Sequence, residues 1–161
     1  MNEFQIFQNK LLSAHLIWEF AKSYEDYNLD HSHPDIFSTL PVLPICLNAR
    51  AVKTIKERRL REGSLLKVVD EQKDIFAGLQ ERMQNMAQHT LESIYFAATT
   101  NLIHFDKESF VLIPSRKNVP QKILRTLGKN YLDLLSTSKR LGAWTANMNI
   151  SELSLYFNIH Y

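Results

Sequence analysis

The chain has 161 residues, of which 45% are hydrophobic and 22% charged, a composition typical of one globular domain with a sizeable core. Its four glycines and five prolines exclude low-complexity and disordered classes and provide no glycine-rich phosphate loop. A single cysteine excludes a disulfide scaffold and a thiolate zinc site, and the net charge of +2 does not dictate a charged partner.

The N-terminal segment predicts an amphipathic helix over 4–24, followed by a polar loop over 23–34. Apolar residues step by three and four along one face of this helix, namely Phe4, Phe7, Leu11, Ala14, Trp18 and Ala21. Further apolar residues widen the stripe, so we expect the helix to be covered on more than one side. MNEFQIFQNK places an acid before the first lysine, the reverse of the order in a secretory signal. No segment has the roughly 20 apolar residues that a membrane-spanning helix needs. We therefore expect a cytoplasmic protein with no membrane contact.

Pro41 and Pro44 interrupt the next apolar stretch, because proline lacks an N–H and restricts the residue before it. We expect a short helical turn over 35–40 and then a buried, kinked segment that ends at Leu47.

Asn48 is expected to cap a helix over 49–59, and Gly63 to end it. Ser64 is then expected to cap another short turn over 65–69.

The middle of the chain predicts a winged-helix-like element over about 74–114. Two helices are expected, over 74–87 and 90–99, with Thr90 as the N-cap of the second. The buried face of the second helix is predicted to consist of Leu91, Ile94, Tyr95 and Ala98. The hydrophobic period then changes from 3.6 to 2 over 103–113, which predicts a β-hairpin. Helix, turn, helix and hairpin is the order of a winged helix, an architecture that by itself settles no function.

The last third predicts another helix. Its seam alternates steps of four and three through Leu127, Tyr131, Leu134, Ser138, Leu141, Thr145 and Met148. Gly128 and Gly142, with the polar seam positions, favour packing inside a bundle over a free coiled coil. A final short helix is expected to start at Asn149 or Ser151. We find no internal repeat and no linker, so 1–161 is predicted to be a single, compact, mainly α domain.

The sequence offers no convincing catalytic, cofactor or metal site. It contains no Walker-type loop, no G-x-S-x-G elbow, no H-E-x-x-H and no C-x-x-C. The densest polar cluster, DHSHPD at 30–35, has metal-ligating side chains, but a surface loop is the simpler interpretation. His15 and Cys46 are expected to be buried, and His104 to face solvent from a strand. We therefore expect no enzyme activity and no cofactor.

Two basic clusters are candidates for contact with DNA phosphates. They consist of Lys53, Lys56, Arg58, Arg59 and Arg61 around the end of one predicted helix, and of Arg116 and Lys117 after the predicted hairpin. Clustered cations bind phosphates through the release of counterions, whereas the alternative is a solvated helix face. The predicted recognition helix has no Lys or Arg between Thr90 and Asn101, which argues against base recognition and favours a protein contact.

The order of three segments resembles a known family. They are LPVLPICLN at 40–48, ESIYFAATTNLIHFDKESFVLIP at 92–114 and SKRLGAWTANMNISELSLYFNI at 138–159. Over about 7–157, the chain is similar to the middle components of three-component ABC-ATPase systems. These prokaryotic conflict systems include Lamassu-type defence.

The resemblance implies a small helical adaptor without catalysis of its own. Such a subunit would bridge an SMC- or Rad50-like ABC ATPase and an effector, commonly a nuclease, in anti-phage or anti-plasmid defence, and DNA could bind through the assembled complex. Interface anchors are often aromatic, and the residues expected to contact partners are Tyr95, Phe96, Leu141 and Trp144. The alternative is a stand-alone winged-helix DNA-binding transcriptional regulator. A small hydrolase is a third class, for which the sequence assembles no convergent polar pocket.

Overall fold

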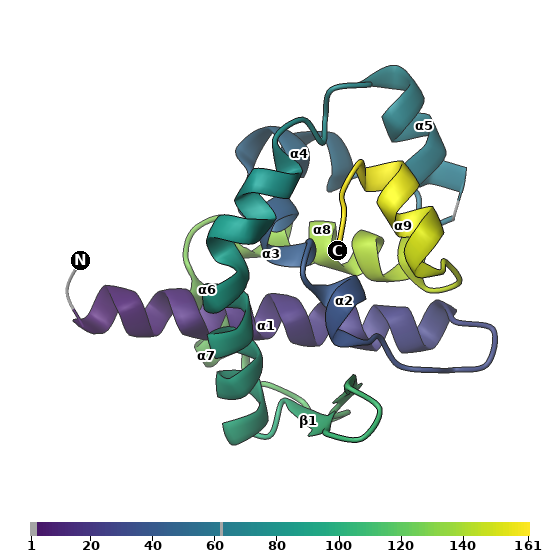
Figure 1. The fold of residues 1–161 in the computed structure, drawn as a ribbon. Helices are drawn as coiled ribbons and strands as arrows, with labels where there is room; N and C mark the ends of the chain where they lie inside the picture. The colour runs from purple at the N-terminus through teal and green to yellow at the C-terminus, as the bar shows by residue number, and fades with distance from the viewer. Residues whose placement is uncertain (1–2, 62) are drawn as a thin grey trace.

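The computed structural model describes residues 3–61 and 63–161, and these residues form mainly helices with one antiparallel hairpin (Figure 1). The elements are, in chain order, α1 (Glu3–Tyr27), α2 (Ile36–Thr39), α3 (Val42–Cys46), α4 (Ala49–Ile55), α5 (Gly63–Glu71), α6 (Leu79–Thr99), β1 (Ile103–Asp106), β2 (Val111–Pro114), α7 (Gln121–Leu124), the 3-10 helix η1 (Arg125–Leu127), α8 (Tyr131–Thr145) and α9 (Ile150–Phe157). The predicted mainly α class with a hairpin is confirmed.

Helix α1 runs through the molecule and packs against both α8 and α6 (Figure 1). Its residues Leu16, Ile17 and Phe20 are fully buried, which confirms that the helix is covered on more than one side. Gly142 allows α8 to approach α1 closely, because a Cβ at this position would lie 2.5 Å from the Phe20 carbonyl oxygen. Ser138 Oγ donates a hydrogen bond to the Leu16 carbonyl oxygen at the same contact. The predicted packing of α8 inside a bundle is therefore confirmed.

The N-terminal helix extends beyond its predicted C-terminal end. It continues to Tyr27, beyond the predicted end at residue 24, so the polar loop starts later than expected. Phe4 and Phe7, which belong to the predicted apolar face, lie outside the part of the chain whose side chains the structure describes.

The proline-containing segment folds as the short helices α2 and α3. Asp35 caps α2, because its carboxylate accepts a hydrogen bond from the Ser38 N–H at 2.8 Å. Every residue of α3 is buried as predicted, but Leu47, the last residue of the segment predicted to be buried, is exposed. Asn48 caps α4 as predicted, and its side-chain oxygen accepts from the Ala51 N–H at 3.0 Å.

The prediction that Gly63 ends the helix after Asn48 is wrong. Helix α4 already ends at Ile55, and Gly63 is the first residue of α5. The Arg58 side chain takes the acceptor that its own N–H would use in a longer helix, because Arg58 Nε donates to the Thr54 carbonyl at 3.2 Å while the Arg58 N–H donates to the Ile55 carbonyl. Side chains of α8 hold the turn that follows, since Arg140 Nε donates to the Arg58 carbonyl and Trp144 Nε1 donates to the Arg59 carbonyl at 2.9 Å.

The predicted helix–turn–helix is also wrong. Helix α6 is continuous from Leu79 to Thr99, and Thr90 is buried in its middle instead of capping a second helix. No Gly or Pro interrupts this stretch, so the helical hydrogen bonds continue through it. Before α6 the chain forms turns, and Gly78 adopts the left-handed conformation with φ 74° at the N-cap. The stretch 74–114 therefore contains one helix and a hairpin in place of the predicted winged-helix arrangement.

The predicted hairpin is confirmed. β1 and β2 pair antiparallel, with Ile103 opposite Pro114 and Asp106 opposite Val111. Phe110, which the sequence places in the second strand, lies in the turn with φ 59° and is exposed.

The last helix is α9. Asn149, one of the two positions predicted to start it, is its N-cap. Its side chain accepts from the Glu152 N–H at 2.9 Å, and the Glu152 carboxylate completes a capping box. Phe157 of α9 packs edge-on against Phe76, with ring centroids 5.0 Å apart. Within the described residues, no helix is long and apolar enough to cross a membrane.

Candidate partner-binding groove

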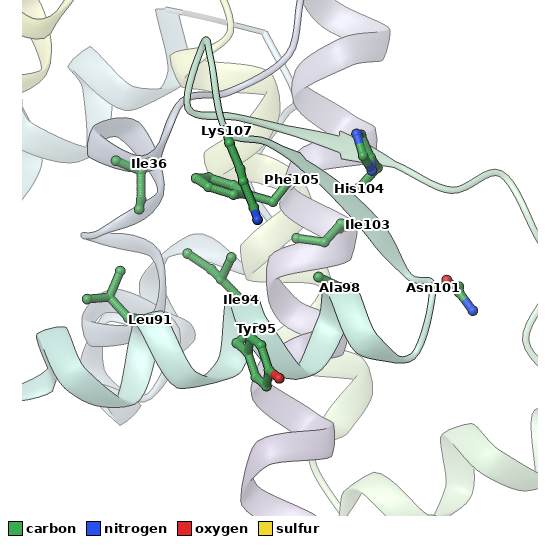
Figure 2. A pocket seen from close by; sticks show the side chains of 10 residues that line it. All are labelled: Ile36, Leu91, Ile94, Tyr95, Ala98, Asn101, Ile103, His104, Phe105 and Lys107. Carbon is green, nitrogen blue, oxygen red and sulfur yellow. The ribbon is translucent and has the colours of Figure 1, made fainter.

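An open, apolar groove of about 530 Å³ lies between α6 and β1 (Figure 2). It is lined by Ile36, Leu91, Ile94, Tyr95, Ala98, Asn101, Ile103, His104, Phe105 and Lys107. Tyr95 is 72% exposed and Leu91 is 48% exposed, although both side chains are apolar over most of their surface. Contiguous apolar surface of this kind marks interaction sites.

The spacing of residues along α6 explains one wall of the groove. Leu91, Ile94, Tyr95 and Ala98 recur at intervals of three and four and therefore share one face. The sequence predicts this face to be buried, but only Ile94 is buried, because the neighbouring hairpin diverges from the helix toward the N-terminal end of that face (Figure 2). The groove is the space that this divergence leaves.

The opposite wall is strand β1. Ile103 and Phe105 project to one side of the strand and His104 to the other, as alternation requires, and all three border the groove. His104 is exposed, which confirms its prediction. The side chain of Lys107 extends across the mouth of the groove in front of Phe105 (Figure 2).

The four residues expected to contact partners lie in different environments. Tyr95 lies in the groove, and Phe96 beside it is half-buried against the core. Leu141 and Trp144 are instead core residues of α8, and the Trp144 ring is completely buried. A buried side chain offers a partner no surface, so the structure corrects the expectation for Leu141 and Trp144.

The first basic cluster is partly neutralised within the subunit. Lys56 Nζ lies 3.2 Å from the Asp133 carboxylate, and Arg58 forms an ion pair with Glu71. The hydrogen bond from Arg58 holds the pKa of the Glu71 carboxyl below its ordinary value. These two cations are therefore less available to phosphates than the sequence suggests.

The remaining members of that cluster, Lys53, Arg59 and Arg61, are exposed and form no ion pair with any described residue. Arg59 and Arg61 border a shallow hollow of about 850 Å³, together with Arg58 and Arg140. Burial lowers the pKa of Arg140, whose guanidinium donates to the backbone of α8 and of the turn after α4. The first cluster thus keeps exposed positive charge around this hollow.

The second basic cluster is engaged by its own surroundings. Arg116 lies 2.8 Å from the Glu25 carboxylate and 2.9 Å from that of Asp26, and these hydrogen bonds raise the pKa of Arg116. Lys117 Nζ donates to the Thr100 carbonyl oxygen at 2.9 Å. This cluster therefore presents little net positive charge to a phosphate backbone.

The polar cluster at 30–35 lies in the connection between α1 and α2. His33 Nε2 lies 2.8 Å from the Glu25 carboxylate, and Asp35 serves as the cap of α2. Among the described residues, no group of three or more His, Cys, Asp and Glu side chains is placed to hold a metal ion. Cys46 and His15 are buried as predicted.

Comparison with models of protein families identifies the family of the chain. The family model described as ABC-three component (ABC-3C) system Middle Component 3 matches residues 1–160. The chain belongs to this family. The match covers nearly the whole chain and confirms the resemblance carried by the three sequence segments. The family description implies that other components accompany this one in a three-component system. No curated protein and no solved structure matches the chain.

Proposed function

We propose that this middle component is a non-enzymatic adaptor that acts in the cytoplasm and needs no cofactor. It bridges an SMC- or Rad50-like ABC ATPase and an effector, commonly a nuclease, in a prokaryotic anti-phage or anti-plasmid defence complex. Family membership supports its place in a three-component system. The observation that carries the adaptor role is the exposed apolar groove between α6 and β1.

The groove favours protein contact for an energetic reason. Burying one large apolar side chain contributes about 1.5–3 kcal/mol, and both Tyr95 and Leu91 remain largely exposed in the isolated subunit. A partner that covers them gains this free energy. Tyrosine is also common among interface anchors, because its ring is large and rigid and its hydroxyl can face water.

A bridging subunit needs a second surface, and the region of α5 and α9 offers one. These helices contact each other at the end of the molecule away from β1 (Figure 1). Leu66 of α5 and Ile150 and Leu155 of α9 are all exposed, and Leu155 is 77% exposed. Exposed apolar side chains in a second region, apart from the groove, fit a subunit that holds two partners at once.

The stand-alone winged-helix regulator receives less support. That function needs a helix–turn–helix, whereas α6 is one continuous helix whose second half has no Lys or Arg. We therefore assign any DNA contact to the assembled complex, through the exposed Lys53, Arg59 and Arg61.

Reconstitution tests the adaptor role directly. The tagged chain is co-expressed with the ABC ATPase and the effector encoded alongside it, and assembly is measured by size-exclusion chromatography with light scattering. We expect one complex that contains all three proteins, and no association of the ATPase with the effector when the chain is omitted. Equal association of those two proteins without the chain would contradict the bridging role.

A further inference from the structure

The hairpin has one covered edge and one open edge. The segment before α2 covers β2, because the Leu112 N–H donates to the Pro34 carbonyl at 2.8 Å and the Ile36 N–H donates to the Phe110 carbonyl at 3.0 Å. The sheet has two strands in the described part of the chain, so β1 forms its other edge.

The register shows which backbone groups point outward from β1. In an antiparallel pair, alternate residues direct their N–H and C=O toward the partner strand and away from it. The Leu112 N–H points away from β1, so its opposite residue, Phe105, also directs its N–H and C=O away from β2. Ile103, two residues earlier, has the same orientation, and Leu102 accepts from the Ser115 N–H as the alternation requires. Phe105 therefore presents one donor and one acceptor at the open edge, whereas Ile103 has the same orientation but is buried at the start of the strand.

This open edge borders the apolar groove. No residue of β2 lines the groove, whereas side chains from both faces of β1 do. Lining by both faces of a strand is expected when a groove follows the edge of the strand. Along the groove, α6 supplies an apolar wall through Leu91, Ile94 and Tyr95 (Figure 2).

The charge at the mouth of the groove is positive. Lys107 is exposed, extends across the opening and forms no ion pair with any described residue. No carboxylate is among the lining side chains. An occupant with a carboxylate next to its apolar residues would complement this charge.

We propose that the groove binds an extended segment of a partner protein, which adds to the hairpin as a third strand beside β1. Apolar side chains of the segment lie against α6, and an acidic residue pairs with Lys107. An unpaired strand edge beside a hydrophobic groove is the arrangement that supports strand addition, in which main-chain hydrogen bonds supply affinity and alternate side chains supply specificity. This inference rests on the proposed adaptor function and specifies how one partner docks.

Overlapping peptides that cover the ATPase and the effector encoded alongside the chain provide the probe. Each peptide is titrated into the intact chain, and amide hydrogen exchange is followed by NMR. We expect a peptide with alternating apolar residues and an acid to bind and to slow exchange at the Phe105 amide. Tyr95→Glu should weaken binding about tenfold or more, as expected for an interface anchor. Leu132→Glu, at a 65% exposed position of α8 outside the groove, is the matched control and should bind as the native chain does.

Exchanging the charges of Lys107 and of the peptide's acidic residue tests whether these two side chains pair. Lys107→Glu should weaken binding about threefold at low salt, and replacing the peptide's acid by lysine should restore it in this variant. If neither change alters the affinity, the acidic residue does not pair with Lys107 and the charge complementarity is refuted.

The other outcomes separate this inference from the proposed function. If the intact partners bind Tyr95→Glu as tightly as the native chain, the groove proposal fails while the adaptor function stands. If Tyr95→Glu abolishes binding but the Phe105 amide exchanges equally fast in the complex, the partner occupies the groove without adding a strand, and strand addition is refuted. A dimer of the chain that Tyr95→Glu disrupts would identify a second copy as the occupant. Failure of every component to bind overturns the proposed function and this inference together.

Discussion

The contact of α8 with the turn after α4 and the groove beside α6 hold similar residues in opposite environments. Trp144 on α8 is completely buried, and its indole N–H donates to the Arg59 carbonyl in that turn. Tyr95 on α6 has a similar large ring but lies 72% exposed, since no described element covers its face. Aromatic residues at helical spacing thus mark an apolar face, and only the neighbouring element decides whether that face is core or binding surface.

The largest expected effect is on the free energy of unfolding, and it distinguishes Trp144 from Tyr95. Trp144→Ala should lower the free energy of unfolding by about 3–5 kcal/mol, because it leaves a cavity and removes the hydrogen bond to Arg59. Tyr95→Ala should change it by less than about 0.5 kcal/mol, as for an exposed site, while weakening partner binding. Urea denaturation of both variants measures the difference. Native stability in Trp144→Ala would contradict its assignment to the core.

The close approach of α1 and α8 predicts the next effect. Gly142→Ala places a methyl group 2.5 Å from the Phe20 carbonyl oxygen, which is backbone and cannot rotate away. We expect a loss of about 1–3 kcal/mol, typical of overpacking. Gly63→Ala is the matched control, since nothing lies within 4 Å of its added Cβ, and it should leave the thermal midpoint nearly unchanged. Equal midpoints for the two variants would show that the helices separate at little cost.

The two basic clusters predict different effects on DNA affinity. In the assembled complex, charge reversal of Lys53, Arg59 and Arg61 should reduce affinity at low salt by about tenfold without unfolding the subunit. Arg116→Gln should have little effect, because Arg116 is engaged by two carboxylates. Fluorescence anisotropy with labelled duplex DNA provides the measurement. Unchanged affinity after the triple charge reversal would show that this surface does not contact DNA.

The smallest expected effect concerns pH. Burial lowers the pKa of His15, whose Nδ1 hydrogen-bonds the Leu11 carbonyl while its buried Nε2 has no hydrogen-bond partner among the described residues. The unfolded chain therefore binds a proton more readily, so stability should fall as pH drops below about 6.5, the ordinary histidine value. His15→Leu should weaken this dependence in urea titrations between about pH 5 and 7. His104→Gln, at an exposed position, should retain the full slope.

Local hydrogen bonds explain why many element boundaries could be predicted. Asp35, Asn48 and Asn149 each cap a helix through a backbone N–H three residues later, so the sequence contains both partners of the interaction. The hairpin follows from alternation over 103–113, where the period of the apolar residues changes. Thr90 also has a capping side chain, yet it lies within a continuous helix, because a capping residue permits a helix start without requiring one.

By itself, the sequence determined the helical class, the caps at Asn48 and Asn149, the hairpin and the family, since these depend on neighbouring residues and on the order of segments. Only the tertiary structure decided the course of the turn after α4, where donors from α8 bind the backbone carbonyls of Arg58 and Arg59. It also decided that Glu25 and Asp26 neutralise Arg116, far away in the chain. The groove has the same origin, because its walls, its open strand edge and the exposure of Tyr95 exist only where β1 diverges from α6.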